Sequence, residues 1–189
     1  MKRPRGWFKC SLAVAFSALS CNSDPDPFPP EAVCPEFDYS SFDGQAPPVS
    51  FSADIHPIFA QNCTETGCHG NPATPASGLF LSPAPDDPAF PADATTRALI
   101  VDTYLVAPAR TTPDKARVAP GEPARSFLMD KLDGSHACID VSCPGNNCGQ
   151  RMPRGHDQLP AEQRDTIRRW IAQGAVADSG RRRGLRAPS

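Results

Sequence analysis

Proline restricts this chain more than any other residue type, because it fixes φ and has no N–H to donate within a helix or sheet. The 189 residues include 23 Pro and 13 Gly, and only 39% are hydrophobic and 7% aromatic. This composition predicts one domain with appendages, in which short elements are joined by long loops around a small core. Small cores commonly need extra support from covalent links, a metal or a large apolar cofactor.

Two cysteines closed by a histidine form the most informative short motif. The segment from Cys63 to His69 reads C-T-E-T-G-C-H, with four residues between the cysteines. A Cys-His dipeptide at the end of such a pair is typical of c-type haem attachment, although the usual spacing is two residues. Both thiols then form thioethers with the haem vinyl groups, and the imidazole takes one axial position on iron. The alternative is a disulfide between Cys63 and Cys68, with His69 a surface loop residue.

The N-terminus predicts export. A basic start is followed by a short apolar run ending at Ser20, too short to span a bilayer stably. Small residues before Cys21, with a polar and Pro-rich stretch after it, resemble a bacterial lipoprotein signal in which Cys21 becomes the lipidated first residue. We therefore expect a signal peptide over 1–20 and a periplasmic or outer-membrane-associated lipoprotein of a Gram-negative bacterium, held at the membrane by its lipid anchor only. An ordinary secretory signal remains the alternative.

Export gives meaning to the remaining cysteines, because thiols oxidise in that compartment. Four of them predict two disulfides, with three possible connectivities; one of these joins Cys138 to Cys143 and Cys34 to Cys148. In a reducing compartment, His136 with Cys138, Cys143 and Cys148 would instead suit zinc.

Charge is unevenly distributed along the chain. From Cys21 onward there are 15 Lys and Arg against 21 Asp and Glu, because 4 of the 19 basic residues precede it. No basic residue lies between Cys10 and Arg97. An acidic flank beside the cysteine motif could steer a basic redox protein, although solvated acidic loops explain it as well. Nothing in this pattern indicates nucleic-acid binding, and the redox partner stays unknown.

Apolar spacing predicts an all-α domain. A first helix is expected over 51–62, capped by Ser52 and leading into Cys63, and a second over about 94–104 with Leu99 and Ile100 inward. A third follows Pro120-Gly121, and the clearest runs from Pro160 to Gln173 with Gly174 after it. The expected inward residues of these last two helices are Phe127, Leu128, Leu132, Ile167, Trp170 and Ile171.

A six-coordinate haem needs a second axial ligand opposite His69. Met152 is the best candidate, because its thioether suits haem iron and it lies in a Pro- and Gly-flanked loop before the last helix. His156, in the same loop, is the nearest rival. The other candidates have simpler explanations: packing for Met129, a helix surface position for His56 and loop polarity for His136.

Taken in order, these motifs resemble a family of cytochrome c-like domains found in exported planctomycete and myxobacterial proteins. The resemblance covers about residues 51–176 and includes the segments 51–59, 63–70, 78–79, 118–128, 152–153 and 170–175. It implies a small class I cytochrome c-like fold, with covalent haem c on Cys63 and Cys68 and with His69 and Met152 as axial ligands. A lipidated Pro-rich tether over 21–50 would precede this domain and a disordered basic tail over 177–189 would follow it. The implied role is an envelope-tethered electron carrier rather than an enzyme. A disulfide-stapled, non-haem lipoprotein acting as an interaction module is the alternative.

Overall fold

The computed structural model describes residues 37–107, 112, 114–139 and 141–178. Four α-helices run over His56–Cys63 (α1), Ala94–Leu99 (α2), Phe127–Asp133 (α3) and Ala161–Ala172 (α4). Two π-helical turns extend this set: Phe51–Ile55 (η1) precedes α1, and Ile100–Leu105 (η3) follows α2. Short 3-10 turns lie over Ala76–Gly78 (η2), Pro123–Arg125 (η4), Ser135–Ala137 (η5) and Pro144–Asn146 (η6). Because every regular element in these residues is helical, the all-α prediction is confirmed for the described part.

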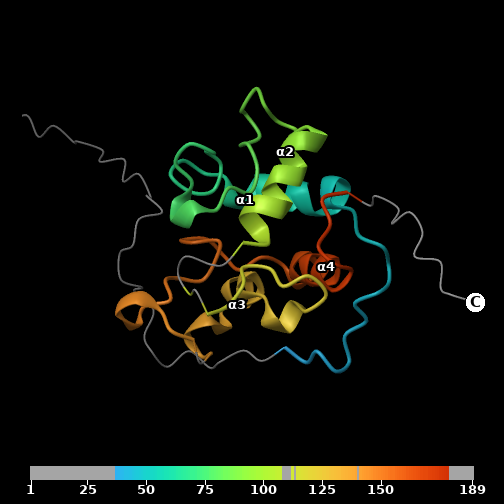
Figure 1. Cartoon of the computed structure of the whole chain (residues 1–189), viewed down its shortest axis with the longest axis vertical. Coiled ribbons are helices and arrows are strands. Elements are labelled where there is room, and N and C mark those ends of the chain that lie inside the picture. Colours follow the sequence, from blue (N-terminus) through green and yellow to red (C-terminus); the bar gives the residue numbers. More distant parts are fainter. Residues whose placement is uncertain (1–36, 108–111, 113, 140, 179–189) are drawn as a thin grey trace, which may run out of the picture.

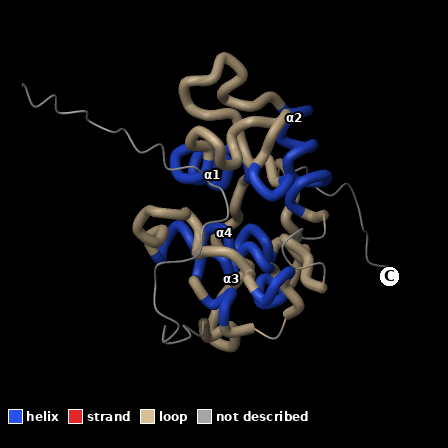
Figure 2. The backbone as a smooth tube through the Cα atoms, turned by 90° about the vertical axis from the view of Figure 1, so that its left-hand side faces the viewer, coloured by secondary structure: helices blue, strands red, loops and turns tan. Residues whose placement is uncertain are grey.

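Long loops connect these helices in two regions (Figures 1 and 2). The upper one holds α1, α2 and the loop between them, and the lower one holds α3, with α4 between the two regions. Contacts of α4 with η1 and with α3 join the regions. Trp170, Ile167 and Ile171 of α4 are fully buried in the shared core, together with Phe51 and Phe59. The inward face predicted for the last helix is therefore confirmed, and this helix is a central element of the packing.

The first helical segment is confirmed, but its cap is not the predicted Ser52. The hydroxyl of Ser50 accepts from the Ala53 N–H at 3.3 Å, and the Ser50 N–H donates to the Asp54 carboxylate at 2.7 Å. These reciprocal bonds satisfy N–H groups that have no partner within the helix. The hydrogen-bonding pattern then changes from π to α beside Pro57, which has no N–H to donate.

The second helical segment also forms where the sequence predicts it, but Leu99 does not point inward. Leu99 is 45% exposed, whereas Ile100 is fully buried. Leu99 is the last residue of α2, which has no buried residue, and the buried residues of this segment all follow it in η3. The buried face is formed by Ile100, Val101 and Leu105, and the expectation for Leu99 was wrong.

The domain includes contacts outside the predicted 51–176 boundaries. Gln173, which follows α4, bonds to two residues of the predicted tether. Its side-chain amide donates to the Pro47 carbonyl at 2.9 Å and accepts from the Val49 N–H at 2.9 Å. At the other end, Asp178 pairs with Arg97 at 3.2 Å. The predicted signal peptide, Cys21, Cys34, and residues 179–189 of the predicted tail lie outside the described residues. In the part of the chain that is described, no helix has the length and apolarity needed to cross a bilayer.

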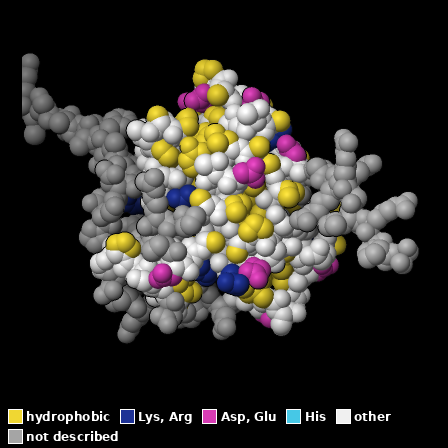
Figure 3. Space-filling view, viewed as in Figure 1, with side chains coloured by type: hydrophobic (Ala, Val, Ile, Leu, Met, Phe, Trp, Pro, Cys, Tyr) yellow, Lys and Arg dark blue, Asp and Glu magenta, His cyan; other side chains and the backbone are white. Residues whose placement is uncertain are grey.

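On the face in Figure 3, Lys and Arg atoms lie beside Asp and Glu atoms near the lower edge, and other charged side chains are scattered among apolar and neutral ones. The most exposed large apolar side chains are also separate in sequence: Leu99, Val106 and Val176. The described part of this face therefore shows no large patch of one sign of charge.

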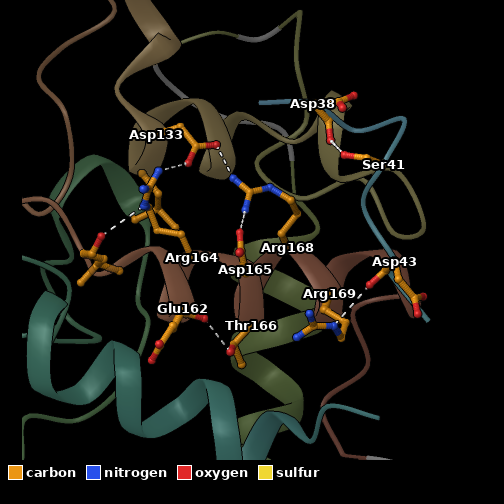
Figure 4. Close-up of polar contacts among 12 residues, drawn as sticks. Asp38, Ser41, Asp43, Asp133, Glu162, Arg164, Asp165, Thr166, Arg168 and Arg169 are labelled. Atoms are coloured by element: carbon orange, nitrogen blue, oxygen red, sulfur yellow. Dashed lines mark hydrogen bonds and ion pairs between the residues drawn. The ribbon is translucent and has the colours of Figure 1, made fainter. Parts of the chain in front are cut away.

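A buried ion-pair network fastens α3 to α4 (Figure 4). The Asp133 carboxylate accepts from Arg164 at 2.6 Å and from Arg168 at 2.7 Å, and Arg168 also pairs with Asp165. Arg168 is 0% exposed, and its guanidinium lies 3.5 Å from the centre of the Phe37 ring. A buried charge is tolerated only when its partners remain in place. The network thus ties the described N-terminal segment, α3 and α4 together.

Replacing Asp133 with Asn should lower the free energy of unfolding by about 3 kcal/mol, because it leaves buried Arg168 with one carboxylate partner. Chemical denaturation of the purified protein measures this loss. The matched control is Glu122→Gln, which breaks the exposed pair with Arg125, whose side chain is 76% exposed. That change should cost less than about 1 kcal/mol; equal effects of the two substitutions would contradict the assigned role of Asp133.

His56 is buried rather than lying on the helix surface as predicted. Its Nε2 lies 2.9 Å from the Ser82 hydroxyl, and its ring stacks on Phe90 with centroids 5.6 Å apart. Burial, with a smaller contribution from the charge of Arg97, lowers the pKa of His56 below its usual value. Folding therefore favours the neutral form of this imidazole.

Stability should consequently fall as the pH drops below about 6.5, the usual histidine pKa, toward the lowered pKa of folded His56. In that window the unfolded chain takes up a proton that the folded chain resists. Comparing His56→Gln with the unchanged protein isolates this contribution from other groups. Denaturation at several pH values should show a shallower acid-side loss for the variant, whereas parallel profiles would refute it.

Candidate functional site

One cavity of about 380 Å³ brings together residues from both regions of the fold. Its walls are largely apolar and include side chains from α1, from η3, from the loop after α1 and from α3: Phe59, Leu79, Leu81, Leu105, Phe127, Leu128 and Leu132. Cys63, Cys68 and His69 border it from one segment, and Met152 borders it from the loop before α4. The structure thus places all four residues of the predicted haem site around the same space.

The chain turn that carries His69 is closed by its own backbone. The Cys68 N–H donates to the Glu65 carbonyl at 2.8 Å, and the His69 N–H donates to the Cys63 carbonyl at 3.0 Å. At the start of this turn, the Thr64 hydroxyl donates to the Ala60 carbonyl of α1 at 2.6 Å. The four-residue spacing is therefore accommodated by a compact turn at the end of α1.

The imidazole of His69 is buried and oriented by the next loop. Its Nδ1 lies 2.8 Å from the carbonyl oxygen of Leu79, and the Leu81 N–H donates to the His69 carbonyl at 3.0 Å. Since a carbonyl can only accept, Nδ1 carries the proton and Nε2 keeps its lone pair. Burial first, and then the nearby charges of Arg117 and Lys131, lower the pKa of His69. A neutral imidazole with a free Nε2 lone pair is the form that binds metals.

Gly70 allows the turn to close tightly against α1. A Cβ at this position would lie 2.5 Å from the Thr64 carbonyl oxygen and 2.9 Å from the Thr64 Cβ. Backbone cannot yield as a flexible side-chain tip can. Gly70, which directly follows the cysteine-histidine motif, is thus required by this close approach.

Gly70→Ala should therefore displace the turn that holds His69 and destabilise the fold by about 1–3 kcal/mol, the usual cost of forced overpacking. Thermal denaturation checks the loss, and proton NMR of the His69 ring checks the displacement. Thr74→Ala, at an exposed position of the following loop, is the control and should leave both readouts unchanged. If the Gly70→Ala protein kept native stability and an unshifted His69 signal, this constraint would be excluded.

Met152 is partly buried against the core, and its backbone N–H donates to the Lys131 carbonyl of α3 at 2.9 Å. His156 also borders the cavity, where its Nε2 lies 3.0 Å from a Glu65 carboxylate oxygen. Met129 lies in the hydrophobic core, as its packing explanation requires. The rival ligands at the cavity are thus Met152 and the exposed His156.

His136 is buried, contrary to its interpretation as a polar loop residue. Its Nε2 lies 2.8 Å from the Gly149 carbonyl oxygen, and this contact joins η5 to the loop before Met152. The histidine therefore supports the cavity wall from behind and does not border the cavity.

The cysteines differ from the example connectivity. Cys143 bonds to Cys148, so a Cys138–Cys143 bond with Cys34–Cys148 is wrong. Cys138 also takes part in a disulfide. These oxidised sulfurs rule out the zinc alternative, and in the described residues no cluster of three or more His, Cys, Asp and Glu is placed to bind a metal. The five-residue separation of Cys143 and Cys148 instead closes a small loop around η6.

Cys63 and Cys68 are in different covalent states. Cys63 is a free thiol, and burial raises its pKa to about 12. Cys68 is disulfide-bonded. The two are therefore not bonded to each other, which removes the predicted alternative of a Cys63–Cys68 disulfide. A sulfur in a disulfide cannot also form a thioether, so haem attachment at Cys68 would require that its disulfide be opened.

Two cavity residues, Arg117 and Lys131, were not singled out from the sequence. Arg117 precedes an apolar Val-Ala-Pro run, and Lys131 lies on a short helix, where surface exposure is the ordinary expectation. The nearest sequence signal is an apolar residue directly after each one: Val118 follows Arg117, and Leu132 follows Lys131.

The residue types around the cavity are those that could hold a haem, except that Cys68 is oxidised. An imidazole with its Nδ1 bonded to a carbonyl and a thioether sulfur border the same apolar cavity, and these are the axial ligands found in cytochromes c. Two cysteines border it as well. Comparison with protein-family models, with curated proteins and with solved structures finds no match for this chain.

Proposed function

We propose that this protein is a c-type cytochrome that carries electrons at the cell envelope. Cys63 and Cys68 would hold the haem covalently, and His69 and Met152 would be its axial ligands. One observation carries the proposal: the Cys-His motif and the methionine predicted from the sequence as its partner ligand, from opposite halves of the chain, border a single, largely apolar cavity.

The chain's own groups suit this role. A bound haem would supply one-electron chemistry at its iron. The Leu79 carbonyl keeps the His69 Nε2 available by holding the proton on Nδ1. The α3 carbonyl of Lys131 fixes the backbone of Met152. Apolar walls exclude water, and a Met/His ligand pair favours a higher reduction potential than two histidines. A protein that carries electrons through these groups would not convert a substrate.

The fold and location belong to the same proposal. An α-helix that ends at Cys63 and a terminal helix packed against the start of the domain suit a class I cytochrome c-like arrangement over 51–176. Lipidation at Cys21, a tether over 21–50 and a periplasmic or outer-membrane location follow from the export signal in the sequence. The partner would be another redox protein.

One observation favours the alternative of a non-haem, disulfide-stapled interaction module. Cys68 is disulfide-bonded in the structure, so its sulfur cannot form a thioether, and only the Cys63 thiol remains for haem attachment. In that case the cavity would be a binding site for another apolar molecule or a partner side chain. Intact mass separates the two functions, since disulfides only remove hydrogens whereas attachment adds one haem.

When produced with haem-attachment machinery in an exporting bacterium, the protein should gain the mass of one haem and show a Soret absorption band. Met152→Leu should shift that band and lower the reduction potential, because the thioether ligand is lost. Met129→Leu is the matched control, since the same change in the core alters packing but not ligation. Absorption spectroscopy and potentiometric titration of both variants provide the measurement.

Protein without added mass under these conditions would reject the cytochrome and support the stapled module. If the protein carries haem and both leucine variants show the spectrum of the unchanged protein, the cytochrome proposal stands but Met152 is excluded as a ligand. His156→Gln then tests the remaining histidine beside the cavity.

A further inference from the structure

Two positively charged side chains border the apolar cavity from within the fold. Arg117 is 7% exposed and Lys131 is 8% exposed, and both line the same space as His69. Cations that are almost fully buried are costly unless hydrogen bonds or opposite charges compensate them. Both lie in a ligand-sized cavity whose walls are largely apolar, although Glu65, Arg154 and His156 also border it.

Hydrogen bonds hold both cations in fixed orientations. Arg117 donates to the Tyr104 carbonyl at 2.7 Å and to the Ser77 carbonyl at 3.0 Å. Lys131 donates to the Cys148 carbonyl at 2.9 Å, and its ammonium lies 5.8 Å from the centre of the Phe127 ring. A guanidinium has five N–H groups and an ammonium three, so each side chain can serve several acceptors at once.

Both side chains border the same cavity as His69. Their backbones are also joined to the cavity walls, because the Leu128 N–H donates to the Arg117 carbonyl at 2.8 Å and Met152 is bonded to Lys131 as described above. The two cations thus belong to the site's framework.

We propose that Arg117 and Lys131 bind the carboxylates of the molecule that fills this cavity, and that for a haem these are its two propionates. This assignment rests on the proposed function. Carboxylates would accept charge-assisted hydrogen bonds from both side chains, and such bonds are roughly twice as strong as neutral ones. The cavity would therefore select for the acidic form of an apolar ring rather than for apolarity alone.

The test compares ferric protoporphyrin IX with its dimethyl ester, in which both propionates are esterified and uncharged. The full chain is purified without haem, and both dissociation constants are measured by absorption titration. The unchanged protein should bind the diacid about 10- to 100-fold more tightly than the ester, the range expected for hydrogen bonds to charged groups. Arg117→Gln and Lys131→Met should each reduce this ratio, and Arg117→Lys should retain most of it.

Using the ratio separates carboxylate binding from loosening of the cavity, which would weaken both ligands equally. Arg125→Gln, at an exposed position outside the cavity, is the control and should keep the unchanged ratio. Equal affinity of the unchanged protein for the diacid and the ester would overturn the carboxylate assignment even if haem is attached covalently. If Arg117→Gln and Lys131→Met weaken the affinity for the diacid and for the ester equally, the assignment is overturned as well, and these residues have a structural role. Absence of covalent haem and of binding to either porphyrin would reject this assignment together with the proposed cytochrome.

Discussion

The Asp133 carboxylate is the constraint on which the lower half of the fold depends. It lies at the end of α3 and is shared by two arginines of α4, one of which has no exposure to water. Because α3 is only seven residues long, it could not persist through its own hydrogen bonds. Anchoring it to the core helix α4 fixes the wall of the cavity that carries Leu128, Leu132 and Lys131.

Backbone hydrogen bonds rather than charge fix the opposite wall. Hydrogen bonds within its own backbone close the turn after α1. In the following loop, the Leu79 carbonyl accepts a hydrogen bond from His69 Nδ1, and the Leu81 N–H donates to the His69 carbonyl. A chain with many prolines cannot surround a site with long regular helices. In this chain short helices form the frame. Individual hydrogen bonds with neighbouring backbone then hold the His69 ring and the Met152 backbone.

Much of this arrangement could be predicted from local sequence. Helix α4 follows from the spacing of Ile167, Trp170 and Ile171, and its end follows from Gly174. Local patterns failed where a partner distant in sequence decides the outcome. His56 is held by Ser82 and Phe90, and His136 by Gly149, so neither burial could be inferred from their polar neighbours. The inward position predicted for Leu99 was also wrong, because the buried residues of this segment begin at Ile100.

The sequence by itself determined the short-helix, loop-rich character of the chain and the chemistry available at Cys63, Cys68, His69 and Met152, because these depend on residue type and near neighbours. Only the tertiary structure decided that these four residues border one cavity, and that Arg117 and Lys131 border it too. It also decided that Cys143 bonds to Cys148. Such outcomes depend on which distant segments share a core, and hydrophobic burial, which drives that choice, is not directional.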